Sequence, residues 1–271
     1  MTASVTHLSA ADNRRGPEAG ISIGALYLMR IQLMSDLHFE FYDFQQNDRF
    51  VKSLDPSLTD VLVVAGDVGP FHICRDALIK LCRHYAPKPV IFVAGNHEYY
   101  GRNFVTADAR ELLDGLLADI DRDFPNFYWL DQGTADIDGQ RFVGCTLWYD
   151  DIGRRDWSDY RHIIGFENWG GRESREHVNF LASEIKEGDV VVTHMLPSLR
   201  CVHERWKQNE DNCFFVREMG YLMQKSEPAL WLFGHTHDRI DTTIYKTRCL
   251  CNPRAYPHEQ PDFDPKLIIE V

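Results

Sequence analysis

Short β-branched and aliphatic runs alternate along the chain with polar clusters, a pattern typical of strands that end abruptly. From residue 27 onward the runs are, in order, YLMRIQLMSDLH, DVLVVAGD, PVIFVAGNHE, RFVGCTLW, DVVVTHMLPS, ALWLFGHTH, TTIYKTRCLCNP and KLIIEV. The early runs are almost continuously apolar, which indicates strands buried on both faces of a sheet covered by helices. The later runs lack long helical crossovers, so we expect those strands to pair in an antiparallel manner.

Amphipathic segments between several of these runs predict helices over 74–85, 104–123, 174–187 and 213–225. In the second of them, the apolar positions that share one helical face are Leu112, Leu113, Leu116, Leu117 and Ile120. There is no internal repeat and no linker. We therefore predict one α/β (α+β) domain over residues 27–271. Residues 1–26, which are polar, rich in Gly and Ala and without period, are predicted to form a flexible N-terminal extension.

Charge and cysteine content narrow the function classes. The formal net charge of −12 over 271 residues argues against long nucleic acids as partners, although bound metal ions can reverse the local field for a small anionic substrate. Seven cysteines, an odd number without a CxxC pair, are expected to be reduced, which suggests a cytoplasmic protein. The longest apolar run near the start contains Arg30 and is too short to span a bilayer, so no membrane partner is expected.

Polar side chains stand at the carboxyl ends of five of the predicted strands. They are Asp36 and His38, Asp67, Asn96 with His97, His194, and the pair His235 and His237 in GHTH. In open α/β sheets this edge is where ligand crevices form. Each fragment alone has a plain structural reading: Asp36 as a cap, Asp67 as a turn residue and His194 as a core histidine. Strands arriving side by side would instead bring them into one site.

The residue types in these fragments suit a particular chemistry. Carboxylate, amide oxygen and imidazole without any thiolate favour manganese, iron or zinc over calcium or a structural zinc. Two such ions, typically ~3.5–4 Å apart, can flank the attacking and leaving oxygens of an in-line displacement at phosphorus. A histidine beside an amide ligand, as His97 is beside Asn96, can donate a proton to the leaving oxygen.

In the order DxH, GD, GNHE, TH, GHTH, these fragments resemble the calcineurin-like metallophosphoesterase superfamily over about residues 36–253. The resemblance implies a four-layer sandwich of two mixed β-sheets flanked by α-helices, with a dinuclear metal site at the strand ends. It also implies roles for eight residues: Asp36, His38 and His237 on one metal, Asn96, His194 and His235 on the other, Asp67 bridging both, and His97 as the catalytic acid. A purely structural role for His97 is the alternative.

Departures from the family pattern indicate the subtype. The Ser/Thr protein phosphatases of this superfamily carry GDxVDRG, whereas this chain has GDVGPFH, so the acid that would orient His97 is missing at that position. The sequence looks like the smaller bacterial phosphodiesterase-type members. We expect hydrolysis of a small phosphodiester with two divalent or transition metal ions (Mn, Fe or Zn). The alternatives are a broad phosphomonoesterase or phosphatase and, less favoured, a nuclease or a non-catalytic scaffold.

Two segments without a structural period, 147–163 and 198–215, are predicted to line the mouth of the site, because long loops in compact domains are often functional. The candidates for stacking are Trp148, Trp157, Tyr160 and Trp206, and those for phosphate contact are Arg154, Arg155, Arg161, Arg200 and Arg254. The alternative is that these arginines form solvated ion pairs with neighbouring acids. Neither the substrate-binding residues nor the oligomeric state follows from the sequence.

Overall fold

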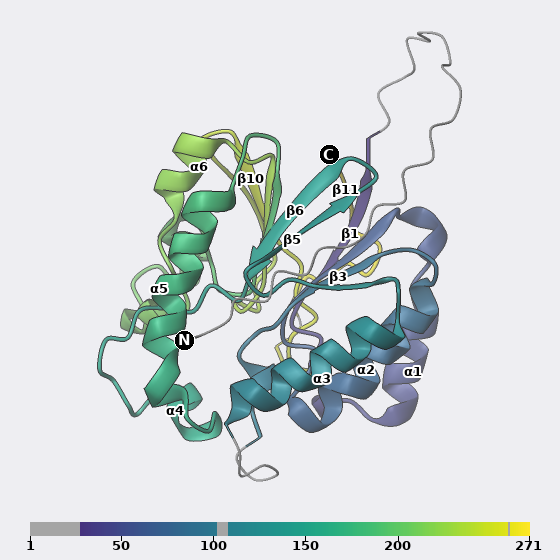
Figure 1. Ribbon diagram of the computed structural model, residues 1–271, viewed down its shortest axis with the longest axis horizontal. Helices are drawn as coiled ribbons and strands as arrows, with labels where there is room; N and C mark the ends of the chain where they lie inside the picture. The colour runs from purple at the N-terminus through teal and green to yellow at the C-terminus, as the bar shows by residue number, and fades with distance from the viewer. Residues whose placement is uncertain (1–27, 102–107, 260) are drawn as a thin grey trace, which may run out of the picture.

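Eleven strands form two sheets in the computed structural model, which describes residues 28–101, 108–259 and 261–271 (Figure 1). The strands are β1 (Arg30–Met34), β2 (Val61–Ala65), β3 (Val90–Val93), β4 (Phe127–Trp129), β5 (Gly133–Ile137), β6 (Gln140–Cys145), β7 (Val190–Thr193), β8 (Leu230–Phe233), β9 (Ile240–Ile244), β10 (Thr247–Cys251) and β11 (Ile268–Glu270). The predicted extension at 1–26 lies outside the described residues, so the predicted domain division stays a prediction.

The two sheets are both mixed. The five-stranded sheet has the order β11-β1-β2-β3-β4, and the six-stranded sheet has the order β5-β6-β7-β8-β10-β9. In each sheet the central strands are parallel and the antiparallel pairs lie at the edges. The carboxyl ends of the central strands of a sheet consequently meet along one edge.

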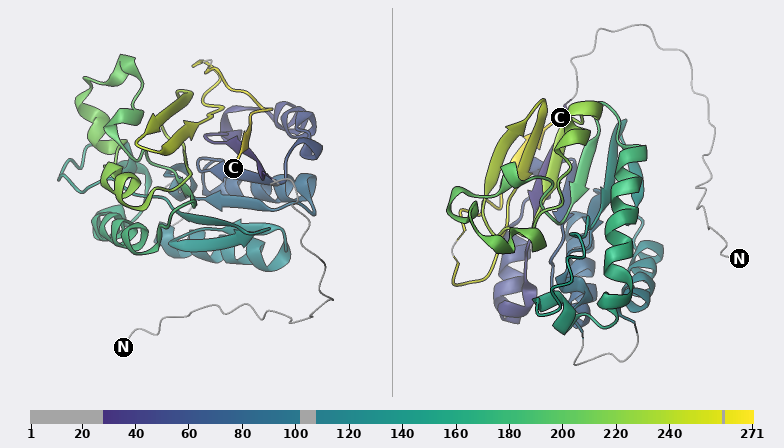
Figure 2. Two further views of the ribbon diagram at one scale, coloured as in Figure 1. Left: turned by 90° about the horizontal axis from the view of Figure 1, so that it is seen from above. Right: turned by 90° about the vertical axis from the view of Figure 1, so that its left-hand side faces the viewer.

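Helices cover the outer face of each sheet (Figures 1 and 2). The α-helices are α1 (Phe44–Ser53), α2 (Phe71–Tyr85), α3 (Ala109–Asp123), α4 (Ser158–His162), α5 (Phe166–Glu184) and α6 (Gly220–Ser226). Short 3₁₀ helices are η1 (Phe39–Phe41), η2 (Pro56–Leu58), η3 (His97–Tyr99), η4 (Leu199–Cys201), η5 (Glu204–Trp206) and η6 (Glu210–Phe214). Helices α1 to α3 lie on the five-stranded sheet, and α4 to α6 lie on the side of the six-stranded sheet, which gives the predicted four-layer α/β sandwich.

Alternation along the strands explains how both faces of each sheet are buried. In β2, Val61 and Val63 belong to the apolar cluster between the sheets, while Leu62 and Val64 belong to the cluster beneath the helices. All five residues of β2 are buried, as the continuous apolar run predicts. Phe142 of β6 is fully buried between the sheets. The carboxyl ends of the facing strands are therefore held in register by a packed apolar layer.

The helix predictions are correct in position for α2 and in part for the others. Helix α3 ends where predicted, but it begins at Ala109, and residues 104–107 of the predicted segment lie outside the described residues. Helix α5 begins at Phe166, eight residues before the predicted start at 174. The segment 213–225 is wrong as one helix, because its first residues end η6 and α6 begins only at Gly220.

The expectation that the later strands pair in an antiparallel manner is wrong for the centre of the second sheet. Strand β7 is parallel to both β6 and β8, and β10 is parallel to β8. The crossovers exist but begin irregularly: α4 and α5 connect β6 to β7, and three 3₁₀ helices precede α6 between β7 and β8. No helix among the described residues is long and apolar enough to cross a membrane.

Removing a large side chain from the inter-sheet layer is expected to destabilise the protein strongly. Phe142→Ala should lower the free energy of unfolding by about 3–5 kcal/mol, because a buried ring is replaced by a cavity. The matched control is Phe44→Ala, since Phe44 is 77% exposed; its effect should stay within about 0.5 kcal/mol. Urea denaturation followed by circular dichroism measures both. Equal losses for the two variants would contradict this description of the core.

Candidate metal centre

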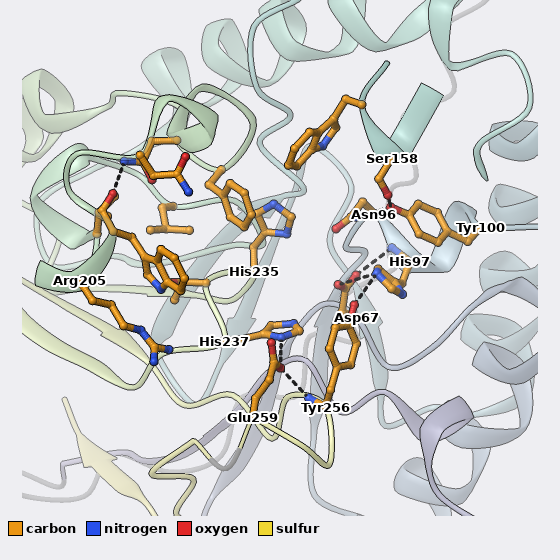
Figure 3. Close-up of a pocket in the computed structure, with 18 residues that line it drawn as sticks. Asp67, Asn96, His97, Tyr100, Ser158, Arg205, His235, His237, Tyr256 and Glu259 are labelled. Carbon is orange, nitrogen blue, oxygen red and sulfur yellow. Dashed lines mark hydrogen bonds and ion pairs between the residues drawn. The ribbon is translucent and has the colours of Figure 1, made fainter. Parts of the chain in front are cut away.

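Five strands deliver their C-terminal polar residues to one place. In the first sheet the parallel neighbours β1, β2 and β3 lead to Asp36, Asp67 and Asn96. In the second sheet the parallel neighbours β7 and β8 lead to His194 and His235. Because the sheets face each other across a packed layer, the two sets of strand ends converge. Figure 3 shows Asp67, Asn96, His97, His235 and His237 around one cavity.

The backbone at these positions adopts a conformation that side chains other than glycine rarely take. Eleven described non-glycine residues have positive φ, and five of them are predicted metal ligands: Asp36 (φ 50°), His38 (42°), Asp67 (54°), His235 (69°) and His237 (52°). Such residues cost free energy and persist where the surrounding structure enforces them, typically at functional sites. The left-handed turns direct the side chains out of the strands and into the cavity.

Glycines before the ligands allow the loops to approach closely. A Cβ at Gly66 would overlap the ring of His194, and a Cβ at Gly95 would overlap the carboxylate of Asp67. Gly66 also has φ of +83°, which glycine adopts without strain. The glycines of the GD and GNHE fragments are therefore required because the space beside each is filled by a predicted ligand from another strand.

Four side chains form the first cluster of candidate ligand atoms. Asp36, His38, Asp67 and His237 each place one N or O atom within 4.8 Å of the others. The Nε2 atoms of His38 and His237 are 3.1 Å apart, and Nε2 of His237 is 3.5 Å from Oδ1 of Asp36. Oδ2 of Asp67 lies 3.8 Å from Nε2 of His38. These residues are the set predicted for the first metal together with the predicted bridge.

A second cluster lies beside the first and shares Asp67. His194, His235 and Asp67 form a group of the same compactness, all buried. Nε2 of His194 is 3.4 Å from Oδ1 of Asp67 and 3.1 Å from Oδ1 of Asn96. Asp67 thus directs Oδ2 toward the first cluster and Oδ1 toward the second. The structure brings all seven predicted ligands together, in two groups that meet at this carboxylate.

Each of the four histidines in the two clusters has one ring nitrogen that points away from the cavity, here called the outer nitrogen. Each outer nitrogen donates a hydrogen bond to an acceptor. Nδ1 of His38 donates to Glu40 (3.0 Å) and Nδ1 of His237 to Glu259 (2.6 Å). Nδ1 of His194 donates to the carbonyl of Ala65 (2.8 Å), and Nε2 of His235 donates to the carbonyl of Phe214 (3.3 Å). With these protons on the outer nitrogens, the inner nitrogens present lone pairs to the cavity, as metal-binding imidazoles do.

The donor set fits two metal ions. The inward nitrogens of His38 and His237, 3.1 Å apart, need a proton or a metal ion between them. The described site holds carboxylate, amide and imidazole donors and no cysteine, which suits Mn, Fe or Zn. The seven cysteines are free, and none of them belongs to either cluster.

Electrostatics keep the carboxylates ionised despite their burial. Burial alone would raise the pKa of Asp67, but His194 and His97 hold it well below its usual value. Burial opposes a charge on His194, yet the Asp67 carboxylate raises its pKa to about 9. Burial lowers the pKa of His235 to about 3, so that this imidazole is neutral at neutral pH. Metal binding at such a site competes with protons on the imidazoles.

His97 lies at the edge of both clusters. Its ring stacks on Tyr100, with centroids 4.3 Å apart, and its Nδ1 is 3.4 Å from Oε1 of Glu40. Its Nε2 faces the site, 4.0 Å from Oδ2 of Asp67 and 3.4 Å from the hydroxyl of Tyr256. Glu40, which follows the DxH fragment by two residues, was missed in the sequence analysis. Its position in DLHFE was the one available signal.

Glu98 holds two of the loops together. Its buried carboxylate accepts hydrogen bonds from the backbone N–H groups of Asp67, Val68, Gly69 and Gly95 at 2.6–3.3 Å. A single side chain thereby satisfies donors from the loops after β2 and β3, the loops that carry Asp67 and Asn96. Glu98 lies within the GNHE fragment, but the fragment alone carries no signal for this role.

Asp159 of α4 fixes the amide of Asn96. Its Oδ1 accepts from Nδ2 of Asn96 (3.0 Å) and from the Tyr100 hydroxyl (2.6 Å), and its Oδ2 accepts from the Tyr149 hydroxyl (2.7 Å). With Nδ2 bound in this way, Oδ1 of Asn96 turns toward His194. Burial raises the pKa of Asp159. No sequence pattern joins residues 96 and 159, so tertiary structure alone reveals this contact.

A pocket of about 300 Å³ opens onto the two clusters. Of the residues predicted to line the mouth, Trp157 and Trp206 do so, whereas Trp148 and Tyr160 are buried in the core. The predicted arginines do not line it. Arg154 pairs with Asp156 and Asp211, Arg155 pairs with Asp151, and Arg254 lies over Tyr42 and Phe50. The alternative of local ion pairs is thus correct for Arg154 and Arg155, and Arg205 lines the pocket instead.

A two-sheet α/β sandwich with paired histidine and carboxylate clusters at its strand ends defines a dinuclear metal-dependent hydrolase. Residues 29–239 match the family model of calcineurin-like phosphoesterases, and the chain belongs to this family. The protein is therefore a metal-dependent phosphoesterase, as the motif order predicts.

Similar proteins span nearly the whole chain. The uncharacterized protein L509 of Acanthamoeba polyphaga mimivirus is 24% identical over an alignment of 279 positions, which covers 90% of this chain and 97% of that protein. The phosphopantetheinyl hydrolase PptH from Mycobacterium tuberculosis has a similar fold (TM-score 0.67, 20% identity, 89% and 95% of the chains covered). A dimetal phosphatase from Danio rerio also matches, with a TM-score of 0.50, 15% identity and 82% and 86% of the chains covered.

Loosening the amide of Asn96 is expected to weaken one of the two metal sites selectively. Asp159→Asn keeps the shape but replaces a charged acceptor with a neutral amide that has one acceptor oxygen, so the hold on Asn96 weakens. One of two manganese ions should bind about 10–100-fold more weakly, as measured by metal analysis after equilibrium dialysis. The matched control is Asp156→Ala, which removes an exposed carboxylate three residues earlier. Unchanged affinity of both ions in Asp159→Asn would contradict the role of this contact.

Proposed function

We propose that this protein hydrolyses a small phosphodiester, with Asp36, His38 and His237 holding one metal ion, Asn96, His194 and His235 holding the other, and Asp67 bridging them. The observation that carries the proposal is the carboxylate of Asp67, which directs one oxygen toward each cluster. When bound, two such ions polarise the phosphoryl oxygens and lower the pKa of bound water toward neutrality.

His97 is proposed to donate the proton to the leaving oxygen. Its Nε2 faces the cavity, and its Nδ1 lies beside Oε1 of Glu40, which supports a protonated ring in a fixed orientation. Glu40 would thus supply the orienting acid that is absent from the GDVGPFH segment. General acid catalysis of this kind typically contributes ~10²–10⁴-fold.

The charge of the pocket supports a diester over a monoester. Near neutral pH a phosphate monoester is close to a dianion, whereas a diester carries a single negative charge. Among the described residues that line the pocket, Arg205 is the one arginine or lysine, and its guanidinium is already paired with Asp238. The described lining therefore offers no unpaired arginine or lysine for the additional charge. Phosphomonoester hydrolysis, as in a broad phosphatase, is the competing function.

Comparison of a diester with a monoester tests the proposal. After manganese loading, bis-p-nitrophenyl phosphate should be hydrolysed with a higher kcat/KM than p-nitrophenyl phosphate. Asp67→Ala should lose both activities and retain less metal by metal analysis, because one carboxylate serves both clusters. A preference for the monoester would establish the competing function. A phosphopantetheinyl diester belongs among the natural substrates tested, since a hydrolase of that group shares the fold.

Glu40 is expected to matter most where the leaving group needs a proton. Glu40→Gln should lower kcat by about 10²-fold for a diester with an alkyl leaving group and by much less for a p-nitrophenyl ester, whose phenolate leaves without protonation. The matched control is Glu259→Gln, since Glu259 contacts the imidazole of His237 and not that of His97. This control should slow both substrates equally. The same equal loss in Glu40→Gln would mean that Glu40 acts only through His38.

A further inference from the structure

The pocket has a second half that the metal chemistry does not use. Figure 3 shows Arg205 on the far side of His235 and His237 from Asp67 and His97. We call the part of the lining that comes from the segment 196–215 and from Trp157 the second half; it includes Arg205, Trp206, Asn209, Asn212 and Phe215. Phe215 packs on the ring of His235, with centroids 4.5 Å apart. The second half is therefore continuous with the metal centre.

Asp238 fixes the exposed indole of Trp206 in the second half of the pocket. Trp206 is 43% exposed, and its Nε1 donates to Oδ2 of Asp238 at 3.0 Å. The guanidinium of Arg205 donates to both oxygens of the same carboxylate, at 2.5 and 3.3 Å. Asp238 is nearly buried and follows the predicted ligand His237 directly. The indole is thus held at the pocket in a defined orientation, with the Arg205 guanidinium over its ring at 5.1 Å from the centroid and neutralised by Asp238.

Two carboxamides beside the indole each have one polar atom to spare. Oδ1 of Asn209 accepts from the N–H of Asp211 (2.9 Å), and Nδ2 of Asn212 donates to the carbonyl of Trp206 (2.8 Å). These contacts determine which end of each amide is engaged. The other ends, Nδ2 of Asn209 and Oδ1 of Asn212, have no hydrogen-bond partner among the residues that the structure describes. Because both asparagines line the pocket, a ligand there can use the amide N–H groups of Asn209 as donors and the carbonyl of Asn212 as an acceptor.

The indole of Trp157 is a second aromatic ring in the same half of the pocket. Trp157 stacks on Phe214, with centroids 4.1 Å apart and an angle of 3° between the ring planes. Its other face is free to contact a ligand, since Trp157 lines the pocket and is partly exposed. Aromatic faces bind planar groups regardless of their sequence or identity. A ligand that fits this half is planar, carries its own donor and acceptor, and has no net charge.

We propose that Trp206, Asn209 and Asn212, with Trp157 and Phe215, form a binding subsite for an uncharged planar group of the substrate alcohol that carries an N–H donor next to a carbonyl acceptor. A secondary amide and a pyrimidine base both have this chemistry. The inference rests on the proposed function, because it describes the alcohol part of the phosphodiester bound at the metal centre. It excludes a second phosphate or carboxylate from that part.

Three diesters with the same leaving group test the subsite. They are the p-nitrophenyl phosphodiesters of methanol, of N-acetylethanolamine and of thymidine (through its 5′-oxygen), so that the retained alcohol is the one difference. At least one of the last two should exceed the methyl ester in kcat/KM by about 10–100-fold. Preference for the N-acetylethanolamine ester assigns the amide, and preference for the thymidine ester assigns the base.

Substitution of the indole supplies the control. In Trp206→Ala the ratio of kcat/KM values between the preferred ester and the methyl ester should fall to about one, and Trp206→Phe should restore part of it. Tyr221→Ala removes an aromatic ring of similar exposure, 52%, on α6 outside the pocket and should leave the ratio unchanged. If wild type hydrolyses all three diesters with equal kcat/KM, or if the ratio is unchanged in Trp206→Ala, the subsite is overturned while the proposed function stays intact.

A failure of the proposed function is distinguishable from a failure of the subsite. If none of the three diesters is hydrolysed by the metal-loaded enzyme, the phosphodiesterase function is overturned. Isothermal titration of N-acetylethanolamine and thymidine, which lack phosphate, into wild type and Trp206→Ala then decides the subsite separately. Binding of either compound that is lost in the variant supports the subsite, and equal binding or no binding overturns it.

Discussion

The carboxylate of Asp67 lies where two groups of electron-rich atoms meet, and much of the fold is organised by that convergence. Its oxygens face His38 on one side and His194 on the other, residues that come from different sheets. Carboxylate oxygens and inward imidazole nitrogens 3–4 Å apart need a proton or a metal ion between them, so the polypeptide must hold the groups together. The apolar layer between the sheets does so, because it holds the ends of β2 and β7 at a constant separation.

The free energy that this site costs is offset locally. Five predicted ligands have positive φ, and each such residue costs of order 1 kcal/mol or more. Glu98 offsets part of the cost, since its four backbone hydrogen bonds join the loops after β2 and β3. Acceptors on the outer imidazole nitrogens restrict the rings further. The first cluster uses the carboxylates of Glu40 and Glu259 for this, whereas the second uses backbone carbonyls, so the first lies in a more negative environment.

Local patterns were sufficient for the strands and for the polar residues that follow them, because a buried strand and the turn that ends it are both encoded by adjacent residues. The role of seven of these residues as ligands came from the family resemblance and stays a prediction. The fold class followed from the order of the motifs and not from the strand pattern, which failed for the parallel strands β7, β8 and β10. Residues that act across the fold were beyond reach for a physical reason. Asp159 lies 63 positions from Asn96 and Glu259 lies 22 from His237, and in neither case does the spacing carry a signal. The prediction that Arg154 and Arg155 contact phosphate failed because Asp151, Asp156 and Asp211 neutralise them locally.

The distribution of charge links the metal centre to the second half of the pocket. A protein with a net charge of −12 repels phosphates in general, and the described lining of the pocket has no free arginine or lysine to reverse that repulsion. Attraction for phosphate is therefore confined to the place where cations bind, between the clusters that share Asp67. Away from that place, recognition has to rest on stacking and on neutral hydrogen bonds, which the indole of Trp206 and the amides of Asn209 and Asn212 supply. A substrate with one buried phosphate and an uncharged alcohol satisfies both halves at once.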